Sequence, residues 1–250
     1  MPYESEDEAG WDALPDVTDD EEVPVEDSIG PLHTGSEPYS YRLQQCDRTL
    51  TIASQPDKGL SFQIWPSAIS LSAYAELQGL QQRGYWKGKR VLELGAGCGL
   101  VGLVFAAMGA QVLLTDLPNV LSLLEQNMLL NKAAIAAGGG SVQCCELTWG
   151  VTSVNSLAQG WATPDLVVAA DVVYHRELFD PLLSTLSSLA AGGYLLAHVR
   201  RWKSDSALFK QLRKRFEVAD ITAEIQSGAE LLSSHTRGAP RLFQLNSKQQ

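Results

Sequence analysis

The sequence predicts one doubly wound α/β domain built on a seven-stranded, mostly parallel sheet with helices on both faces. Three observations support this fold class: seven short apolar segments of strand-like composition, helical periodicity between most of them, and a glycine-rich turn where one strand meets a helix. A chain of 250 residues suits a single domain whose core folds without disulfides. We assign residues 39–250 to this domain.

The segment before the domain differs from the rest in charge. Of the 29 acidic residues in the chain, 13 lie in residues 1–41, which contain none of the 19 lysines and arginines. This stretch also lacks the apolar periodicity that would offset the entropy of ordering, so we predict an acidic, disordered tail over residues 1–38. We interpret the tail as an inert solvated segment, with a partner-binding arm as the alternative.

A small β-hairpin is expected before the main sheet. Short alternating apolar pieces at residues 41–43, 50–52 and 60–64 lie around a turn at Gln55–Gly59, and we expect them to supply the strands of the hairpin. Proline suits the first position of a helix, so Pro66 predicts a helix that runs to about Leu80.

Strands and helices then alternate regularly. The expected strands are Arg90–Leu94, Gln111–Thr115, Ser141–Glu146, Asp165–Ala170, Gly193–Val199, Phe216–Ile221 and Arg241–Asn246, and the expected helices are Leu100–Met108, Asn119–Ala133, Phe179–Ala190 and Ser206–Arg215. No clear helix separates the last two strands, which permits an antiparallel edge to the sheet.

The stretch Glu93–Leu100 joins the first of these strands to its helix. Gly95, Gly97 and Gly99 stand at alternate positions, and glycine permits both a positive φ and a close approach of the backbone to a ligand. A dinucleotide-binding turn would place its third glycine at position 100, where this chain has leucine. The turn therefore predicts a nucleotide-like ligand other than a dinucleotide, and a tight turn without a ligand is the alternative.

Polar and aromatic residues follow the next strands at the same edge of the sheet. Asp116 lies about 20 residues after Gly95, where an acidic residue accepts hydrogen bonds from ribose hydroxyls. Capping of the next helix is the alternative for Asp116. Trp149 would pack on a base or close the core. Asp171 directly follows the apolar strand 165–170, which places it at the lip of the same crevice.

Together these segments resemble a known family. The motifs Trp65-Pro-Ser-Ala, Glu93-x-Gly-x-Gly-x-Gly, Asp116-Leu-Pro, Leu-Thr-Trp149-Gly and Ala170-Asp171-Val-Val-Tyr174 occur in the order typical of the Asp-x-x-Tyr group of seven-strand, Rossmann-like protein lysine methyltransferases. The resemblance covers residues 41–246. Thr148 departs from the pattern, because relatives often have an acidic or other polar residue there, and the acidic tail has no equivalent. The resemblance implies transfer of a methyl group from S-adenosylmethionine to a lysine ε-amine of a non-histone protein, such as a chaperone or translation factor.

The resemblance also implies roles for individual residues. The residues expected to form the cofactor site are Trp65, Glu93, Gly95, Ala96, Gly97, Gly99, Asp116, Leu117, Trp149 and Ala170. Asp171 and Tyr174 would be catalytic and face the substrate amine. Asp171 would hydrogen-bond and orient the incoming ammonium, since an ordinary aspartate is too weak a base to deprotonate it, and Tyr174 would supply an aromatic wall. The implied reaction is a direct SN2 displacement, so the protein mainly aligns donor and acceptor.

Other features limit the possible partners. The four cysteines show no Cys-x-x-Cys pair and no histidine at metal-binding spacing, so we predict no metal site and free thiols in the cytoplasm, with the nucleus as a second location. We expect no signal peptide, no membrane-spanning segment and no nucleic-acid partner, because the corresponding patterns are missing. We expect a monomer.

Two functional alternatives stay open at this point. The same fold could methylate a protein histidine or a small-molecule amine, or the protein could be a cofactor-binding adaptor without catalysis. His175 and His198 are interpreted as structural. The basic turn Arg200–Lys203 would either attract an acidic substrate protein or form an ordinary solvated turn.

Overall fold

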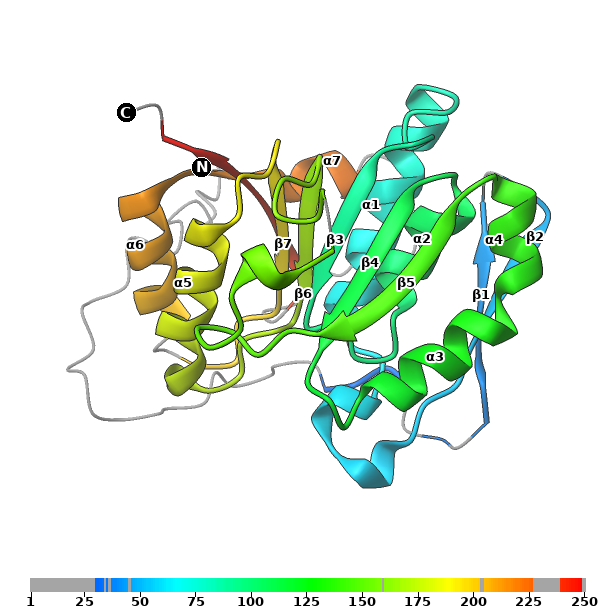
Figure 1. Ribbon diagram of the computed structural model, residues 1–250, viewed down its shortest axis with the longest axis horizontal. Helices are drawn as coiled ribbons and strands as arrows, with labels where there is room; N and C mark the ends of the chain where they lie inside the picture. Colours follow the sequence, from blue (N-terminus) through cyan, green and yellow to red (C-terminus); the bar gives the residue numbers. More distant parts are fainter. Residues whose placement is uncertain are drawn as a thin grey trace, which may run out of the picture.

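The seven-stranded sheet predicted from the sequence forms the centre of the molecule in its computed structural model (Figure 1). The structure describes residues 30–33, 35, 37–44, 46–158, 160–202, 205–226 and 239–248. The strands are β3 (Arg90–Leu94), β4 (Gln111–Asp116), β5 (Ser141–Glu146), β6 (Leu166–Ala170), β7 (Tyr194–His198), β8 (Phe216–Asp220) and β9 (Arg241–Ser247), in the spatial order β5-β4-β3-β6-β7-β9-β8. Neighbouring strands are parallel except β9, which is antiparallel to both β7 and β8. The predicted fold class is confirmed.

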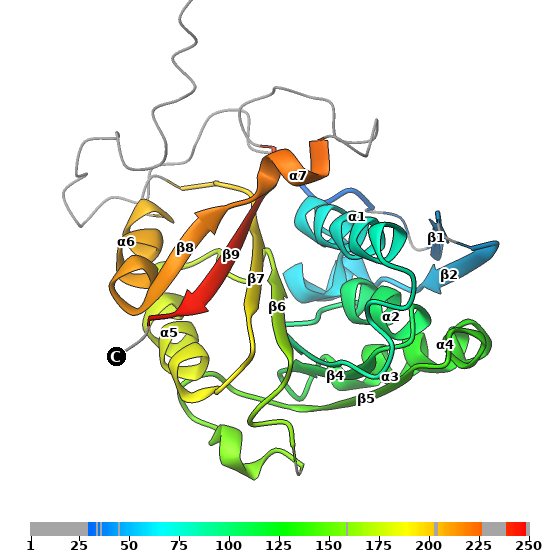
Figure 2. The same cartoon turned by 90° about the horizontal axis from the view of Figure 1, so that it is seen from above.

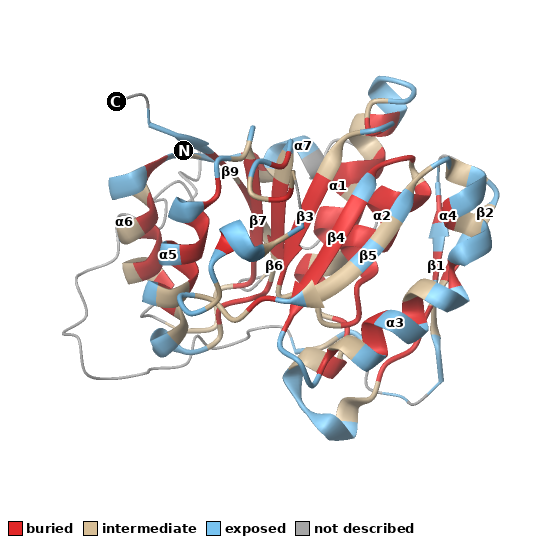
Figure 3. Ribbon diagram, viewed as in Figure 1, coloured by how far each residue is buried: buried red, intermediate tan, exposed pale blue. Residues whose placement is uncertain are grey.

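Helices cover both faces of this sheet because successive strand residues point to opposite sides. In β3, Val91 packs into one apolar cluster, whereas Leu92 and Leu94 pack into the other. The first face carries α1 (Pro66–Gln81), α2 (Leu100–Ala107), α3 (Leu121–Leu130) and α4 (Lys132–Gly138), and the second carries α5 (Phe179–Ser188) and α6 (Asp205–Arg215) (Figure 2). Most of the sheet is buried between these layers, and every residue of α2 is buried (Figure 3).

Two helices stand between β4 and β5, where a single helix over Asn119–Ala133 was predicted. The break falls at Asn131, whose φ is −105° and ψ 6°. The side-chain amide of Asn131 donates to the Thr51 carbonyl and accepts from the Thr51 amide, both at 2.8 Å. Asn127 binds both backbone groups of Ala53 in the same way. The single-helix prediction is wrong because these tertiary contacts set the helix boundary. A short unpredicted helix, α7 (Thr222–Gln226), also follows β8.

A two-stranded antiparallel sheet precedes the main domain, as predicted, but its turn lies elsewhere. β1 (Tyr39–Leu43) pairs with β2 (Arg48–Ile52), so the chain reverses between residues 43 and 48. The predicted hairpin turn at Gln55–Gly59 and the strand predicted at residues 60–64 are wrong. The elements found there are the 3-10 helices η2 (Pro56–Lys58) and η3 (Leu60–Phe62). Pro56 has no amide hydrogen for strand pairing, and the φ of 121° at Gly59 turns the chain away from an extended path.

The acidic tail predicted over residues 1–38 lies mostly outside the described part of the chain, which begins at Gly30. The Leu32 amide donates to the Ile64 carbonyl at 2.9 Å, and His33 forms an isolated bridge with Ile64. The domain boundary near residue 38 stays a prediction. In the described residues, no helix combines the length and the apolar character needed to cross a membrane.

Candidate functional site

A cavity of about 390 Å³ opens at the carboxyl ends of the parallel strands. The residues expected from the sequence that line it are Trp65, Glu93, Gly95, Ala96, Gly97, Asp116, Leu117, Trp149, Ala170, Asp171 and Tyr174. Gly99 is not part of the lining and instead forms the N-cap of α2. The fold therefore brings together all the expected residues except Gly99, while the role of each residue stays a prediction.

The glycine-rich turn after β3 forms part of the cavity wall. Gly95 and Gly97 have φ values of 61° and 55°, which residues with a side chain rarely adopt. A β-carbon at Gly97 would lie 2.9 Å from the carbonyl oxygen of Ser61. At Gly95 it would lie 2.9 Å from Cγ1 of Val172 and 3.0 Å from the Trp149 ring. The turn therefore has no room for side chains and presents its backbone to the cavity.

Asp116 stands at the end of β4, beside this turn. Its Oδ2 accepts a hydrogen bond from the Gly97 amide at 2.8 Å, and its Oδ1 accepts one from the Leu117 amide at 2.7 Å. Burial raises the pKa of the Asp116 carboxyl, and these two hydrogen bonds act in the opposite direction. A carboxylate oxygen accepts two hydrogen bonds, so both oxygens keep capacity for the hydroxyl pair of a ribose.

Glu93 is a buried carboxyl that connects the turn to the following helix. Its Oε2 accepts a hydrogen bond from the Gly102 amide in α2 at 2.7 Å. Burial raises the pKa of Glu93 to about 8, the Gly102 hydrogen bond lowers it in part, and the charge of Asp116 raises it further. Glu93 is therefore mostly protonated at neutral pH, and its contact with Gly102 fixes the turn against α2.

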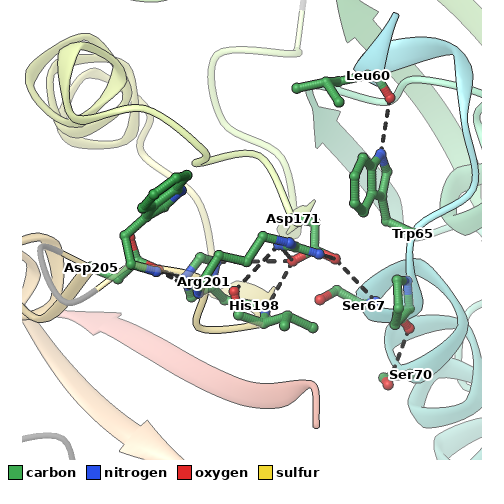
Figure 4. Close-up of polar contacts among 11 residues, drawn as sticks. Leu60, Trp65, Ser67, Ser70, Asp171, His198, Arg201 and Asp205 are labelled. Atoms are coloured by element: carbon green, nitrogen blue, oxygen red, sulfur yellow. Dashed lines mark hydrogen bonds and ion pairs between the residues drawn. The ribbon is translucent and has the colours of Figure 1, made fainter. Parts of the chain in front are cut away.

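Two tryptophan rings provide flat walls. Trp149, in the loop after β5, packs against Gly95, and the Gly150 amide anchors this loop to the Thr185 hydroxyl of α5 at 3.0 Å. Trp65 is the N-cap of α1, and its indole Nε1 donates to the Leu60 carbonyl at 2.9 Å (Figure 4). The hydrogen bond to Leu60 fixes the Trp65 ring directly, and the hydrogen bond of Gly150 fixes the loop that carries Trp149. The flat faces of both rings suit contact with an aromatic base or an alkyl chain.

Asp171 follows β6 and is almost completely enclosed. Its Oδ1 accepts hydrogen bonds from the Val199 amide and from Nη1 of Arg201, both at 2.9 Å. Its Oδ2 accepts from Nη2 of Arg201 at 3.1 Å and from the Ser67 amide at 3.4 Å (Figure 4). With a φ of 52°, Asp171 is the one non-glycine residue of positive φ in the described chain. Such strain is often found at functional sites. Each oxygen of Asp171 thus already accepts two hydrogen bonds, and the expected acceptance of a hydrogen bond from a substrate ammonium stays a prediction.

Tyr174 lines the cavity in the loop that follows Asp171. Burial raises the pKa of its hydroxyl, the charge of Asp116 raises it further, and a hydrogen bond with Ser61 lowers it. The hydroxyl is therefore neutral at physiological pH. The contact with Ser61 connects this loop to η3, the 3-10 helix found where the sequence predicted a strand.

Arg201 is a site residue that the sequence interpretation missed. The Arg201 side chain is 14% exposed and paired with Asp171, so it does not belong to an ordinary solvated turn. Attraction of an acidic substrate protein by Arg200–Lys203 stays a prediction, and Lys203 lies outside the described residues. Paired strands carry the two charges, since β6 ends just before Asp171 and β7 ends three residues before Arg201. Opposite charges after neighbouring parallel strands are a pattern that could have revealed the pair.

These residues fit S-adenosylmethionine. The turn has no room for a β-carbon at Gly95 or Gly97, Asp116 has free capacity for ribose hydroxyls, and Trp149 offers a flat apolar face for an adenine ring. Residues such as Leu117 and Leu147 add apolar surface to the same wall.

Comparison with known proteins identifies the family. A lysine methyltransferase family model matches residues 44–215. Protein N-lysine methyltransferase METTL21A of Danio rerio is 38% identical over 171 residues, which cover 67% of this chain and 74% of that one. EEF1A lysine methyltransferase 3 of Mus musculus is 34% identical over 186 residues, or 72% and 75% of the two chains. Protein Atu636 of Agrobacterium tumefaciens, described as a predicted O-methyltransferase, shares the fold with a TM-score of 0.51 and 17% identity over 73% of this chain and 81% of that one. The chain belongs to the lysine methyltransferase family.

Proposed function

We propose that this protein methylates a lysine side chain of another, non-histone protein. As a member of the lysine methyltransferase family the chain is a methyltransferase, and S-adenosylmethionine is its cofactor. When bound, this cofactor supplies a methyl group already activated by its sulfonium. The protein therefore has to bind both reactants, orient them toward each other and exclude water. The observation that carries the proposal is that the glycine-rich turn, Asp116, Asp171 and Tyr174 line the same cavity.

The residues near β3 and β4 would hold the cofactor. Asp116 would accept hydrogen bonds from the ribose hydroxyls, while the backbone of Gly95 and Gly97 closes the wall behind them. Trp149 and Leu117 would flank the adenine ring. Each of these contacts orients the donor without any covalent step by the protein.

The residues near β6 and β7 would receive the acceptor. A lysine ammonium has an unperturbed pKa of about 10.4 and must lose its proton to water before it can attack. Tyr174 would form an aromatic wall beside the alkyl chain, and removal of the amine from water lowers its pKa. The neutral Tyr174 hydroxyl would provide a hydrogen-bonding contact close to the nitrogen.

The substrate and cellular setting extend this proposal. One relative is named an EEF1A lysine methyltransferase, so we include a translation factor among the candidate substrates, with a chaperone as the other. We also propose a monomer that acts in the cytoplasm, with the nucleus as a second location, and that has no nucleic-acid or membrane partner. The free thiols of all four cysteines support a reducing compartment.

Methyl transfer to a cell extract tests the proposed function. The full-length protein is incubated with methyl-labelled S-adenosylmethionine and extract, and the labelled product is located by mass spectrometry. We expect the label on a lysine ε-amine of a protein, with the signal removed by excess unlabelled cofactor. Label on histidine or on small molecules alone would contradict the proposal, as would cofactor binding without transfer.

A further inference from the structure

A charged pair joins the ends of β6 and β7 at the acceptor side of the cavity. Arg201 donates from Nη1 to Oδ1 of Asp171 at 2.9 Å and from Nη2 to Oδ2 at 3.1 Å, a two-point pairing that suits the planar guanidinium (Figure 4). The Asp171 side chain is 1% exposed and the Arg201 side chain 14% exposed. Arg201 therefore presents the more accessible charge of the pair.

Arg201 is also held by its backbone and by an aromatic ring. Its Cζ lies 4.7 Å from the centroid of the Trp65 ring, within the range of a cation–π contact. The amides of Arg201 and Trp202 donate to Oδ2 of Asp205 at 3.0 and 3.1 Å. Contacts at both ends of the residue thus give the guanidinium one orientation, between a buried carboxylate and a wall of the cavity.

The charged and titratable groups that contact this pair, adjoin it in the chain or line the same cavity come from several elements. They are Tyr174 and His175 after β6, His198 in β7, Arg200 after β7, Asp205 in α6, and Glu93 and Asp116 on the cofactor side. The first turn of α1 contributes the Ser67 amide and no ionisable side chain. Nδ1 of His198 lies 4.0 Å from Asp171, and Nε2 lies 3.1 Å from Asp205. Among the described residues that line the cavity, Arg201 is the one lysine or arginine.

The chemistry of a lysine acceptor explains why this pairing matters. The amine attacks only after its proton has passed to water, and a nearby unpaired carboxylate stabilises the ammonium and opposes that loss. Asp171 without a partner would therefore keep the acceptor protonated. A cation beside the carboxylate cancels this stabilisation of the ammonium, because the cation and the ammonium carry like charges.

We propose that Arg201 is a positioning residue for methyl transfer. It holds the Asp171 carboxylate in the cavity wall and cancels its charge, so that the acceptor amine is neutral at a lower pH. This role rests on the proposed function, since it requires an amine acceptor at this wall. It assigns the electrostatic control of the reaction to the pair rather than to Asp171 alone.

The pH dependence of methyl transfer separates this role from a merely structural one. The rate is measured from pH 6 to 10 with the identified protein substrate for the wild type, Arg201→Gln, Arg201→Lys and the double variant Arg201→Gln/Asp171→Asn. We expect kcat of Arg201→Gln to fall about 100-fold at neutral pH, as for a misplaced acceptor. We also expect the rising limb of the pH–rate profile of Arg201→Gln to move to higher pH by about one unit. Arg201→Lys should recover part of the rate. In the double variant, which has neither charge, the rising limb should return to the pH at which it lies in the wild type.

Two controls make the result decisive. Arg90 pairs with Asp165 at the opposite end of the sheet, so Arg90→Gln should leave the profile unchanged. Cofactor affinity, measured by calorimetry, should stay within about threefold in all variants, which shows that they fold. If the pH–rate profile of Arg201→Gln falls equally at every pH, or equals that of the wild type, the role proposed for Arg201 is overturned while the proposed function stands. Failure of the wild type to methylate any lysine would overturn the proposed function, and the role of Arg201 with it.

Discussion

The two sides of the cavity are built in different ways. Beside β3 and β4, the wall is organised by backbone: the amides of Gly97 and Leu117 hold the Asp116 carboxylate, and the turn has no room for side chains at Gly95 and Gly97. Beside β6 and β7, the wall depends on an ion pair between two side chains, Asp171 and Arg201, that only the folded sheet brings together. The cofactor side is therefore sensitive to added volume, and the acceptor side to changes of charge.

The largest effect should come from added volume at Gly97. In Gly97→Ala the new methyl group meets the carbonyl of Ser61, and the φ of 55° adds strain, so a cost of about 3 kcal/mol is expected. Because the turn escapes this cost by leaving the conformation that lines the cavity, we expect cofactor affinity to fall by up to about 100-fold, measured by calorimetry.

The matched control for this substitution is Gly139→Ala. Gly139 also has a positive φ, 78°, but no atom lies within 4 Å of its β-carbon position. Gly139→Ala should lower stability and leave cofactor affinity unchanged. Equal affinity in Gly97→Ala and Gly139→Ala would show that the contact with Ser61 has no role in the cofactor site.

A smaller effect should distinguish the two carboxylates. Asp116→Asn loses acceptor capacity toward ribose, so we expect the cofactor Kd to rise about tenfold. Asp171→Asn should keep the cofactor Kd and reduce methyl transfer about tenfold, because Arg201 loses its charged partner. Both constants can be measured on the same protein preparations. Full methyl transfer by Asp171→Asn or Asp171→Ala would remove Asp171 from the mechanism.

A separate effect, on stability rather than on binding or catalysis, concerns the pH dependence of unfolding on the cofactor side. Burial raises the pKa of Glu93 from 4.5 to about 8, so the folded protein holds this proton more tightly than the unfolded chain. The unfolding free energy should therefore fall as pH rises from about 4.5 to about 8, by up to about 1.4 kcal/mol per pH unit. Glu93→Gln should flatten this slope in urea unfolding of the cofactor-free protein. An unchanged slope would show that Glu93 is not the responsible group.

The parts of the site that follow from local sequence could be predicted. The glycine-rich turn needs positive φ values at fixed spacing, and Asp116 and Asp171 each stand directly after an apolar strand. The strands themselves follow from apolar composition and from the turns between them. These features depend on residues that are neighbours in the chain, so one sequence is enough to find them.

The parts that depend on tertiary contacts could not be predicted. Arg201 was interpreted as part of a basic turn, either solvated or attractive to an acidic substrate, because its partner Asp171 follows a different strand. Asn127 and Asn131 looked like ordinary helix residues, although their amides bind the backbone of the hairpin. The strand predicted at residues 60–64 is instead the segment that places Ser61 over the glycine-rich turn, a position set by packing rather than by periodicity.

The division of the cavity is tested most directly by one parallel measurement on Gly97→Ala and Arg201→Gln. For each variant, cofactor affinity is measured by calorimetry and methyl transfer is measured with labelled S-adenosylmethionine at saturating protein substrate. We expect Gly97→Ala to lose cofactor binding, and we expect Arg201→Gln to bind the cofactor like the wild type while it loses most of its transfer at neutral pH. Loss of cofactor binding in Arg201→Gln, or wild-type binding in Gly97→Ala, would contradict the separation of the two sides.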